Sequence, residues 1–119
     1  MEFLRYFWDT AVEINSRASN LHESYRFPTT NVEALKGLFD SAGFVETEIS
    51  PIDIDTHFRD FDDYWKPFLG GQGPAPTYVL SLDEPERKKL QDVLFERLPV
   101  QKDGSISMVA RAWAVRGMK

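Results

Sequence analysis

Residues 30–50, TNVEALKGLFDSAGFVETEIS, decide the fold class because a helical pattern changes to a strand pattern within them. Thr30 and Glu33 have the spacing of a capping box, in which the two side chains bind free N–H groups of the first turn. The apolar residues that follow at helical spacing are Val32, Leu35, Leu38, Phe39 and Ala42. Gly43 then marks a helix end, and Val45, Thr47 and Ile49 alternate with polar residues as in a half-buried strand. The stretch therefore predicts a helix that leads directly into a strand.

The residues before this stretch predict a second helix followed by a loop. Apolar residues in positions 1–14 recur at helical spacing and form one stripe of an amphipathic helix: Leu4, Phe7, Trp8, Ala11 and Val12. Residues 15–29 are polar and show no periodicity, which indicates a long surface loop. A loop of this length is often functional, so His22, Glu23, Tyr25 and Arg26 are of interest without an assigned role.

The residues after the stretch predict an aromatic insert and a last strand. The apolar phase shifts at Pro51, which predicts a bulge or a strand end there. A short helix is expected from an N-cap at Asp60 to near Pro67, followed by a Gly- and Pro-rich turn at 70–76. A longer helix then starts near Ser81 and stops at Pro99, with Leu90, Val93, Leu94 and Leu98 on its buried face. Residues 105–115 have apolar side chains on both faces, as in a doubly covered strand.

Length and composition favour one globular domain and exclude several classes of protein. The 119 residues suffice for one core, and we expect a single α/β domain over 1–119 with a helical and aromatic insert at 57–98. A net charge of −5 speaks against a nucleic-acid binder. There is no Cys, no apolar run of membrane-spanning length and no signal-peptide pattern, so no membrane partner and a cytoplasmic location are expected.

Several residues allow both a chemical and a structural interpretation. Asp53, Asp55 and His57 share one face of an extended segment and could bind a metal ion, although capping and solvation explain most acids of this region. His22 and His57 are each either a general base or a surface residue. The Gly-rich turn at 70–73 follows a helix, unlike a dinucleotide-binding loop, and indicates a hinge or a helix stop. The aromatic residues of 61–68 are either core or the wall of a substrate pocket.

The order of these segments carries a resemblance to a known family. FLRYFWDTAVEI, a loop, FPTTNVEALKGLFDSAGFVETEI, an aromatic insert and SISMVARAWAVRG together resemble the C-terminal half of class I S-adenosylmethionine-dependent methyltransferases of the methyltransferase-11 type. The resemblance implies a partial Rossmann-like fold, with a few helices packed on a small sheet in which residues 44–54 and 105–116 form an antiparallel pair. It also implies that residues 57–98 are the insert that covers the substrate.

The Gly-rich loop and the acidic residues by which this family binds its cofactor have no counterpart here. The resemblance therefore implies the acceptor side of a methyltransferase that is inactive as an isolated chain and does not bind S-adenosylmethionine tightly on its own. A truncated gene product, a start codon assigned inside a longer frame, and one half of a split enzyme all stay open. A homo-oligomer is a further expectation, because a half-sheet exposes its edges.

The resemblance also suggests where a small-molecule acceptor would bind, while the catalytic residues stay unknown. We expect an aromatic wall with two polar groups at its edge, formed by Phe7, Trp8, Phe61, Tyr64, Trp65 and Phe68 with Arg5 and Asp9. The alternative is a non-catalytic α/β module that binds an apolar ligand or a protein partner through the same aromatic face.

Overall fold

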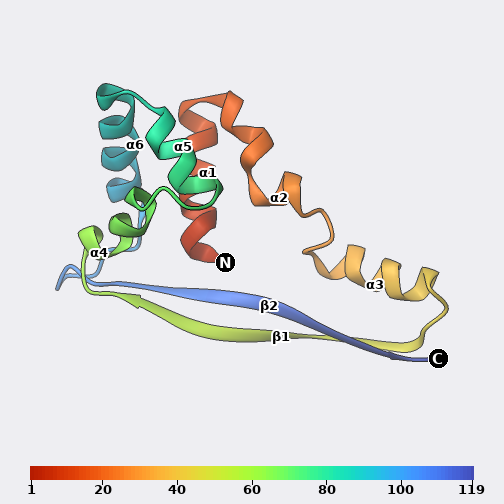
Figure 1. Cartoon of the computed structure of the whole chain (residues 1–119). Coiled ribbons are helices and arrows are strands. Elements are labelled where there is room, and N and C mark those ends of the chain that lie inside the picture. The colour runs from red at the N-terminus through yellow and green to blue at the C-terminus, as the bar shows by residue number, and fades with distance from the viewer.

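The computed structural model describes residues 1–119 and combines helices with one two-stranded antiparallel sheet. In chain order the elements are α1 (Glu2–Ile14), the 3-10 helix η1 (Ser16–Leu21), α2 (Glu23–Arg26), α3 (Val32–Ser41), β1 (Val45–Phe58), α4 (Phe61–Trp65), the 3-10 helix η2 (Lys66–Leu69), α5 (Pro74–Ser81), α6 (Glu84–Arg97) and β2 (Ile106–Met118). Figure 1 shows α1, α5 and α6 together over one end of the sheet and α3 near the other end. The expected mixture of helices with an antiparallel strand pair is confirmed.

The two strands are longer than their sequence pattern predicted. Their register runs from Val45 opposite Met118 to Phe58 opposite Ile106, with an irregularity between Val45 and Glu48. The bulge or strand end expected at Pro51 is wrong, because Pro51 lies within β1 opposite Trp113. Each strand of a two-stranded sheet has one unpaired edge, so a residue without an N–H group fits there without breaking the ladder.

The core lies between the helices and the end of the sheet that contains Ile106 and Met108. It contains fourteen buried hydrophobic residues, which are Phe7, Trp8, Ala11, Ala18, Tyr64, Trp65, Phe68, Ala75, Val79, Leu90, Leu94, Leu98, Ile106 and Met108. We call α1, α4, η2, α5 and α6 the helical body, because they supply most of these side chains. The expected buried face of α6 is confirmed at Leu90, Leu94 and Leu98.

The helix α3 forms where its sequence predicts it but buries none of its residues. Its N-cap is Asn31, whose side chain accepts from the Ala34 N–H group at 2.8 Å. The capping box expected at Thr30 is therefore wrong, since the Thr30 hydroxyl donates to the Phe27 carbonyl instead. The helix ends before Gly43, which has the positive φ of 88° expected at that position. Within its apolar stripe, Leu35 and Phe39 are half-buried where α3 contacts the strand pair, whereas Val32 and Leu38 are 37% and 56% exposed.

Two segments that were expected to be irregular contain helices. Residues 15–29 include η1 and α2, so the expected continuous loop is wrong there. Residues 74–81 form α5 rather than a turn, because two prolines in the first helical turn lack only N–H groups that have no helical partner. Gly73 precedes them with φ 88° and ψ 174°, a conformation that residues with a Cβ atom avoid.

The molecule is more extended than a compact domain of its length. Its principal extents are 53, 34 and 22 Å, and its radius of gyration is 17.2 Å. A compact chain of this length would have a radius of gyration of about 13–14 Å. The long strand pair and α3, which reach beyond the helical body in Figure 1, account for the difference. None of the helices has the length and apolar character needed to cross a bilayer.

Candidate functional site

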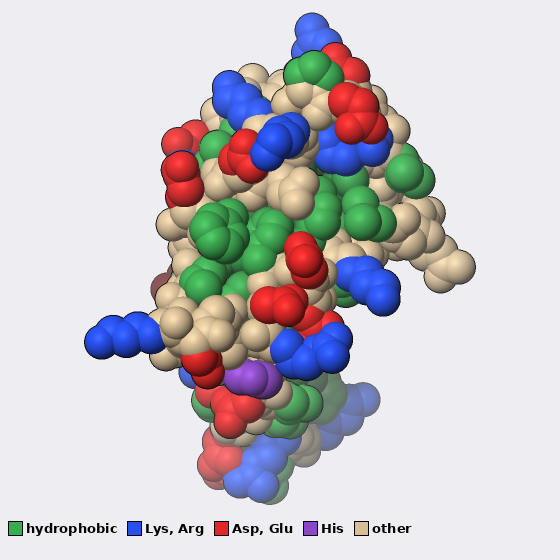
Figure 2. Space-filling view, turned by 90° about the vertical axis from the view of Figure 1, so that its left-hand side faces the viewer, with side chains coloured by type: hydrophobic (Ala, Val, Ile, Leu, Met, Phe, Trp, Pro, Cys, Tyr) green, Lys and Arg blue, Asp and Glu red, His purple; other side chains and the backbone are tan.

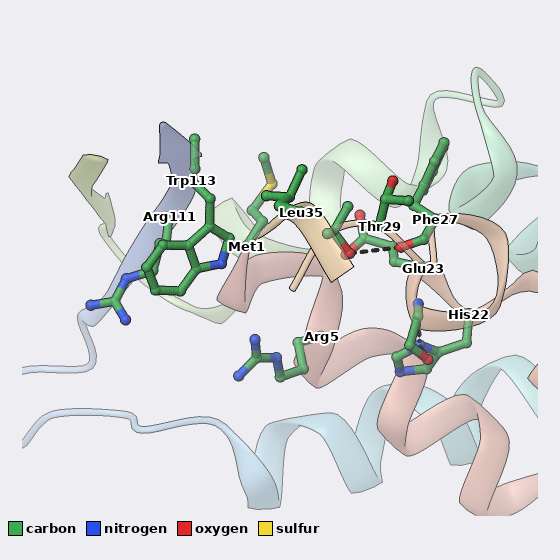
Figure 3. Close-up of a pocket in the computed structure, with 12 residues that line it drawn as sticks. Met1, Arg5, His22, Glu23, Phe27, Thr29, Leu35, Arg111 and Trp113 are labelled. Atoms are coloured by element: carbon green, nitrogen blue, oxygen red, sulfur yellow. Dashed lines mark hydrogen bonds between the residues drawn. The ribbon is translucent and has the colours of Figure 1, made fainter. Parts of the chain in front are cut away.

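The largest cavity opens between the first turns of α1, the α2–α3 segment and β2 (Figure 3). We call it the α1–β2 cleft, and it has a volume of about 640 Å³. The residues that line it are Met1, Arg5, His22, Glu23, Ser24, Phe27, Thr29, Thr30, Leu35, Arg111, Ala112 and Trp113. The cleft therefore combines apolar and aromatic surface with cationic, anionic and imidazole groups, a combination typical of small-molecule sites.

Arg5 is the one side-chain cation of the cleft that has no partner. The two acidic residues of α1 that could reach it, at positions three before and four after, are Glu2 and Asp9. The Glu2 carboxylate accepts from the backbone N–H of Val109 at 2.6 Å, and Asp9 accepts from His22. No hydrogen bond or ion pair is formed by the Arg5 side chain, which leaves its guanidinium free to bind a ligand.

Asp9, His22 and Ser24 form a chain of hydrogen bonds at the edge of the cleft. The Asp9 Oδ1 atom lies 2.8 Å from His22 Nε2. On the other side of the ring, His22 Nδ1 accepts from the Ser24 backbone N–H at 3.1 Å and lies 2.8 Å from Ser24 Oγ. Because Nδ1 accepts the backbone N–H, the network assigns the proton of a neutral ring to Nε2. The chain joins the start of α2 to α1 and fixes one side of the cleft.

Arg111 lines the cleft but is already paired. Its Nε and Nη2 atoms donate to the two carboxylate oxygens of Asp53 at 2.6 and 2.8 Å. The hydrogen bonds from Arg111 hold the pKa of Asp53 below its ordinary value. The guanidinium carbon also lies 5.4 Å from the ring centre of Trp113, a cation–π distance. Arg111 is thus held by β1 and fixes the indole of Trp113 beside it.

A second hollow of about 280 Å³ lies on the other side of Glu23, which lines both cavities. Phe3, Leu4, Trp8 and Phe68 line its apolar side, and residues 72–76 also line it. In this hollow, two residues of the expected aromatic wall lie beside the Gly- and Pro-rich segment.

The expected wall residues otherwise pack on one another. Phe7, Trp8, Tyr64, Trp65 and Phe68 are each at most 5% exposed. Phe7 stacks on Phe68 with ring centres 4.4 Å apart. The structure therefore gives these five residues a packing role, and acceptor binding by them stays a prediction.

Phe61 differs from the other wall residues because it is only partly buried. It stacks on Trp65 at 6.2 Å and meets Phe95 of α6 edge to face at 5.3 Å. Figure 2 views the α4 and α6 side of the molecule and shows apolar side chains gathered between acidic and basic ones. Phe95, 53% exposed, belongs to this side.

The acidic residues between Asp53 and Asp63 mostly cap helices or form ion pairs. Asp60 caps α4 by accepting from the Asp63 N–H at 2.8 Å, as its sequence position predicted. Hydrogen bonds from Arg59 hold the pKa of Asp63 below its ordinary value. His57 Nδ1 lies 3.2 Å from Ser107 Oγ across the sheet. The structure contains no group of three or more His, Asp or Glu residues arranged to hold a metal ion.

Arg5 and Asp9 are predicted as site residues from the sequence, but the residues that lie near them in the structure are not. The sequence leaves His22 as either a general base or a surface residue, and it does not single out Arg111 or Trp113. The one sequence signal for Arg111 is its charge within an otherwise apolar strand. Only the strand register explains this charge, because it places Arg111 opposite Asp53. Comparisons with protein-family models, with curated proteins and with solved structures find no match to this sequence.

Proposed function

We propose that residues 1–119 are the acceptor side of a class I S-adenosylmethionine-dependent methyltransferase, and that the cofactor-binding half lies outside these residues. The observation that carries the proposal is the order of elements from α3 onwards. The helix α3 leads through Ala42-Gly43-Phe44 into β1, a helical insert follows, and β2 returns antiparallel beside β1. This is the order that the sequence resemblance implies for the C-terminal half of the family.

The exposed apolar surfaces support a chain that packs against further structure. Ile52 and Ile54 on β1 are 54% and 65% exposed, and Val32 and Leu38 of α3 are 37% and 56% exposed. Each strand also has an unpaired edge. In our proposal the sheet of the cofactor half continues from one of these edges, which would complete a Rossmann-like sheet.

We place the small-molecule acceptor in the α1–β2 cleft, beside the second hollow, which Trp8 and Phe68 help to line. The cofactor would supply the methyl group, and the residues of this chain would hold the acceptor and shield it from water. Orientation and proximity alone account for a large part of the acceleration in reactions between two bound molecules. The buried aromatic residues keep α1 in place and so position Arg5.

A reading of the genomic DNA upstream of the Met1 codon tests the proposal. We expect an open frame that encodes a strand, a Gly-rich loop and a helix, either in frame with Met1 or in a neighbouring gene. A stop codon directly upstream, together with no such frame nearby, would contradict the proposal.

A non-catalytic module that binds a protein partner is the second candidate. The exposed apolar side chains of α3, Val32 and Leu38, favour it, because exposed apolar surface commonly marks an interface. If the purified chain binds no small aromatic ligand but forms a stable complex through α3 with a protein that does not bind S-adenosylmethionine, this second function replaces the first.

A further inference from the structure

We propose that the α1–β2 cleft selects acceptors that carry a carboxylate beside a flat aromatic ring. Arg5 binds the carboxylate and Trp113 packs against the ring. This inference rests on the proposed function, because it names the class of acceptor that the same cleft would take.

The guanidinium of Arg5 is free to bind the carboxylate of a ligand. The chain has a net charge of −5, and most of its other arginines are already paired with carboxylates. Arg5 has no such partner, because Glu2 and Asp9 are bound to other groups. A guanidinium offers two parallel N–H groups that match a carboxylate, so a ligand carboxylate is its natural counterpart.

Trp113 and its neighbours supply the aromatic side of the site. The Trp113 side chain is partly exposed, whereas Trp8 and Trp65 are buried. Arg111 holds the indole from one side, and Asp53 balances the charge of Arg111, so Arg111 does not compete with Arg5 for an anion. A flat ring that packs on Trp113 would also approach the apolar side chain of Leu35, which lines the same cleft.

The charge distribution in the cleft limits the ligand to a single negative charge at one end. In Figure 3, Arg5, Arg111 and Trp113 lie towards one side of the cleft, and His22 and Glu23 lie towards the other. Glu23 forms no ion pair, so its carboxylate disfavours a second anionic group near it. A monocarboxylate fits this arrangement better than a phosphate, which carries nearly two charges.

The experiment is a titration of the full chain followed by NMR of the tryptophan indole N–H groups. The probes are benzoate, 4-hydroxybenzoate and indole-3-acetate, each compared with its uncharged amide. The Trp113 signal is assigned from its loss in Trp113→Phe. We expect at least one carboxylate to shift this signal in a saturable way, with a dissociation constant about tenfold or more below that of its amide, as for a hydrogen bond to a charged group.

The variants locate the carboxylate at Arg5. Arg5→Gln should remove the preference for the acid over the amide, and Arg5→Lys should keep part of it. Arg17→Gln, which removes an exposed arginine of η1, is the matched control and should keep the full preference. Thermal unfolding by circular dichroism checks that each variant is folded.

The outcomes separate this inference from the proposed function. If the acids and amides bind equally, the selection of carboxylates is wrong. If Arg5→Gln keeps the preference, the assignment of the carboxylate to Arg5 is wrong. An acceptor site in the cleft stands in both cases. If none of the six probes shifts the Trp113 signal, both the inference and our placement of the acceptor are wrong.

Discussion

Phe68 shows at the scale of one residue why the aromatic stretch belongs to the core. Its ring stacks between Phe3 and Phe7, with ring centres 4.8 and 4.4 Å away, and it also contacts Tyr64 and Trp65. Aromatic residues bury the largest apolar areas, and such stacked pairs add to the stability gained from burial. The neighbouring Leu69 is 50% exposed and contributes little.

This contrast predicts the effect of two adjacent substitutions. Phe68→Ala should lower the free energy of unfolding by about 3–5 kcal/mol, because it leaves a large cavity in the core. Leu69→Ala should change it by less than about 0.5 kcal/mol. Urea denaturation followed by fluorescence measures both. Equal effects of the two substitutions would mean that Phe68 is not a core residue.

Tyr64 provides a test that depends on pH. Its hydroxyl donates to the Phe3 carbonyl at 2.9 Å, and burial raises the pKa of the phenol above its ordinary value. A raised pKa means that the folded state prefers the protonated phenol. Its contribution is therefore complete below about pH 10, the ordinary Tyr pKa, and is lost as the pH rises further.

We expect Tyr64→Phe to cost about 1 kcal/mol of stability at pH 7, the usual value of a hydrogen bond. The variant should also lose less stability than the wild type between pH 10 and about pH 11. Tyr25→Phe, at a 70% exposed position, is the control. Parallel denaturation curves of wild type and Tyr64→Phe over this pH range would contradict the account.

At the scale of elements, local signals in the sequence predicted those helices and strands whose stabilising contacts are close in sequence. The helix α3, the Gly43 stop, the Asp60 cap and the buried face of α6 all follow from patterns within a few turns. The α5 helix was missed because Gly and Pro usually indicate a turn, whereas here Ala75 and Val79 pack into the core and stabilise the helix. The cleft was missed for a similar reason, since it depends on contacts between Asp9 and His22 and across the strand pair.

Alanine substitutions at Gly73 and Gly37, which have different backbone conformations, test where α5 begins. Gly73→Ala should destabilise the protein by about 1–3 kcal/mol, because its backbone conformation is open almost only to glycine. Gly37 lies inside α3, and an added Cβ atom would meet nothing within 4 Å. Gly37→Ala should therefore stabilise the protein by about 0.5–1 kcal/mol. Thermal melts of both variants provide the measurement, and a neutral Gly73→Ala would show that α5 does not begin there.

At the scale of the whole molecule, the extended shape follows from a strand pair that is covered at only one end. Ile106 and Met108 at that end are buried in the core. Ile52 and Ile54 lie further along the same sheet, where no helix of the body reaches them. An uncovered apolar strand with a free edge readily pairs with another chain.

We therefore expect the isolated chain to self-associate as its concentration rises. Ile54→Lys should weaken this association, because it introduces a charge on the uncovered part of β1. Leu69→Lys adds the same charge on the helical body, at a residue of similar exposure, and should leave the association unchanged. Light scattering after gel filtration measures the mass, and a monomer at every concentration would contradict this expectation.

In our proposal, this chain holds the acceptor and the cofactor half lies elsewhere. Calorimetric titration with S-adenosylmethionine tests it most directly, on residues 1–119 alone and on the same chain joined to or mixed with the upstream or neighbouring half. The account predicts no measurable binding to residues 1–119 and saturable binding once the second half is present. Tight binding to residues 1–119 alone would contradict the claim.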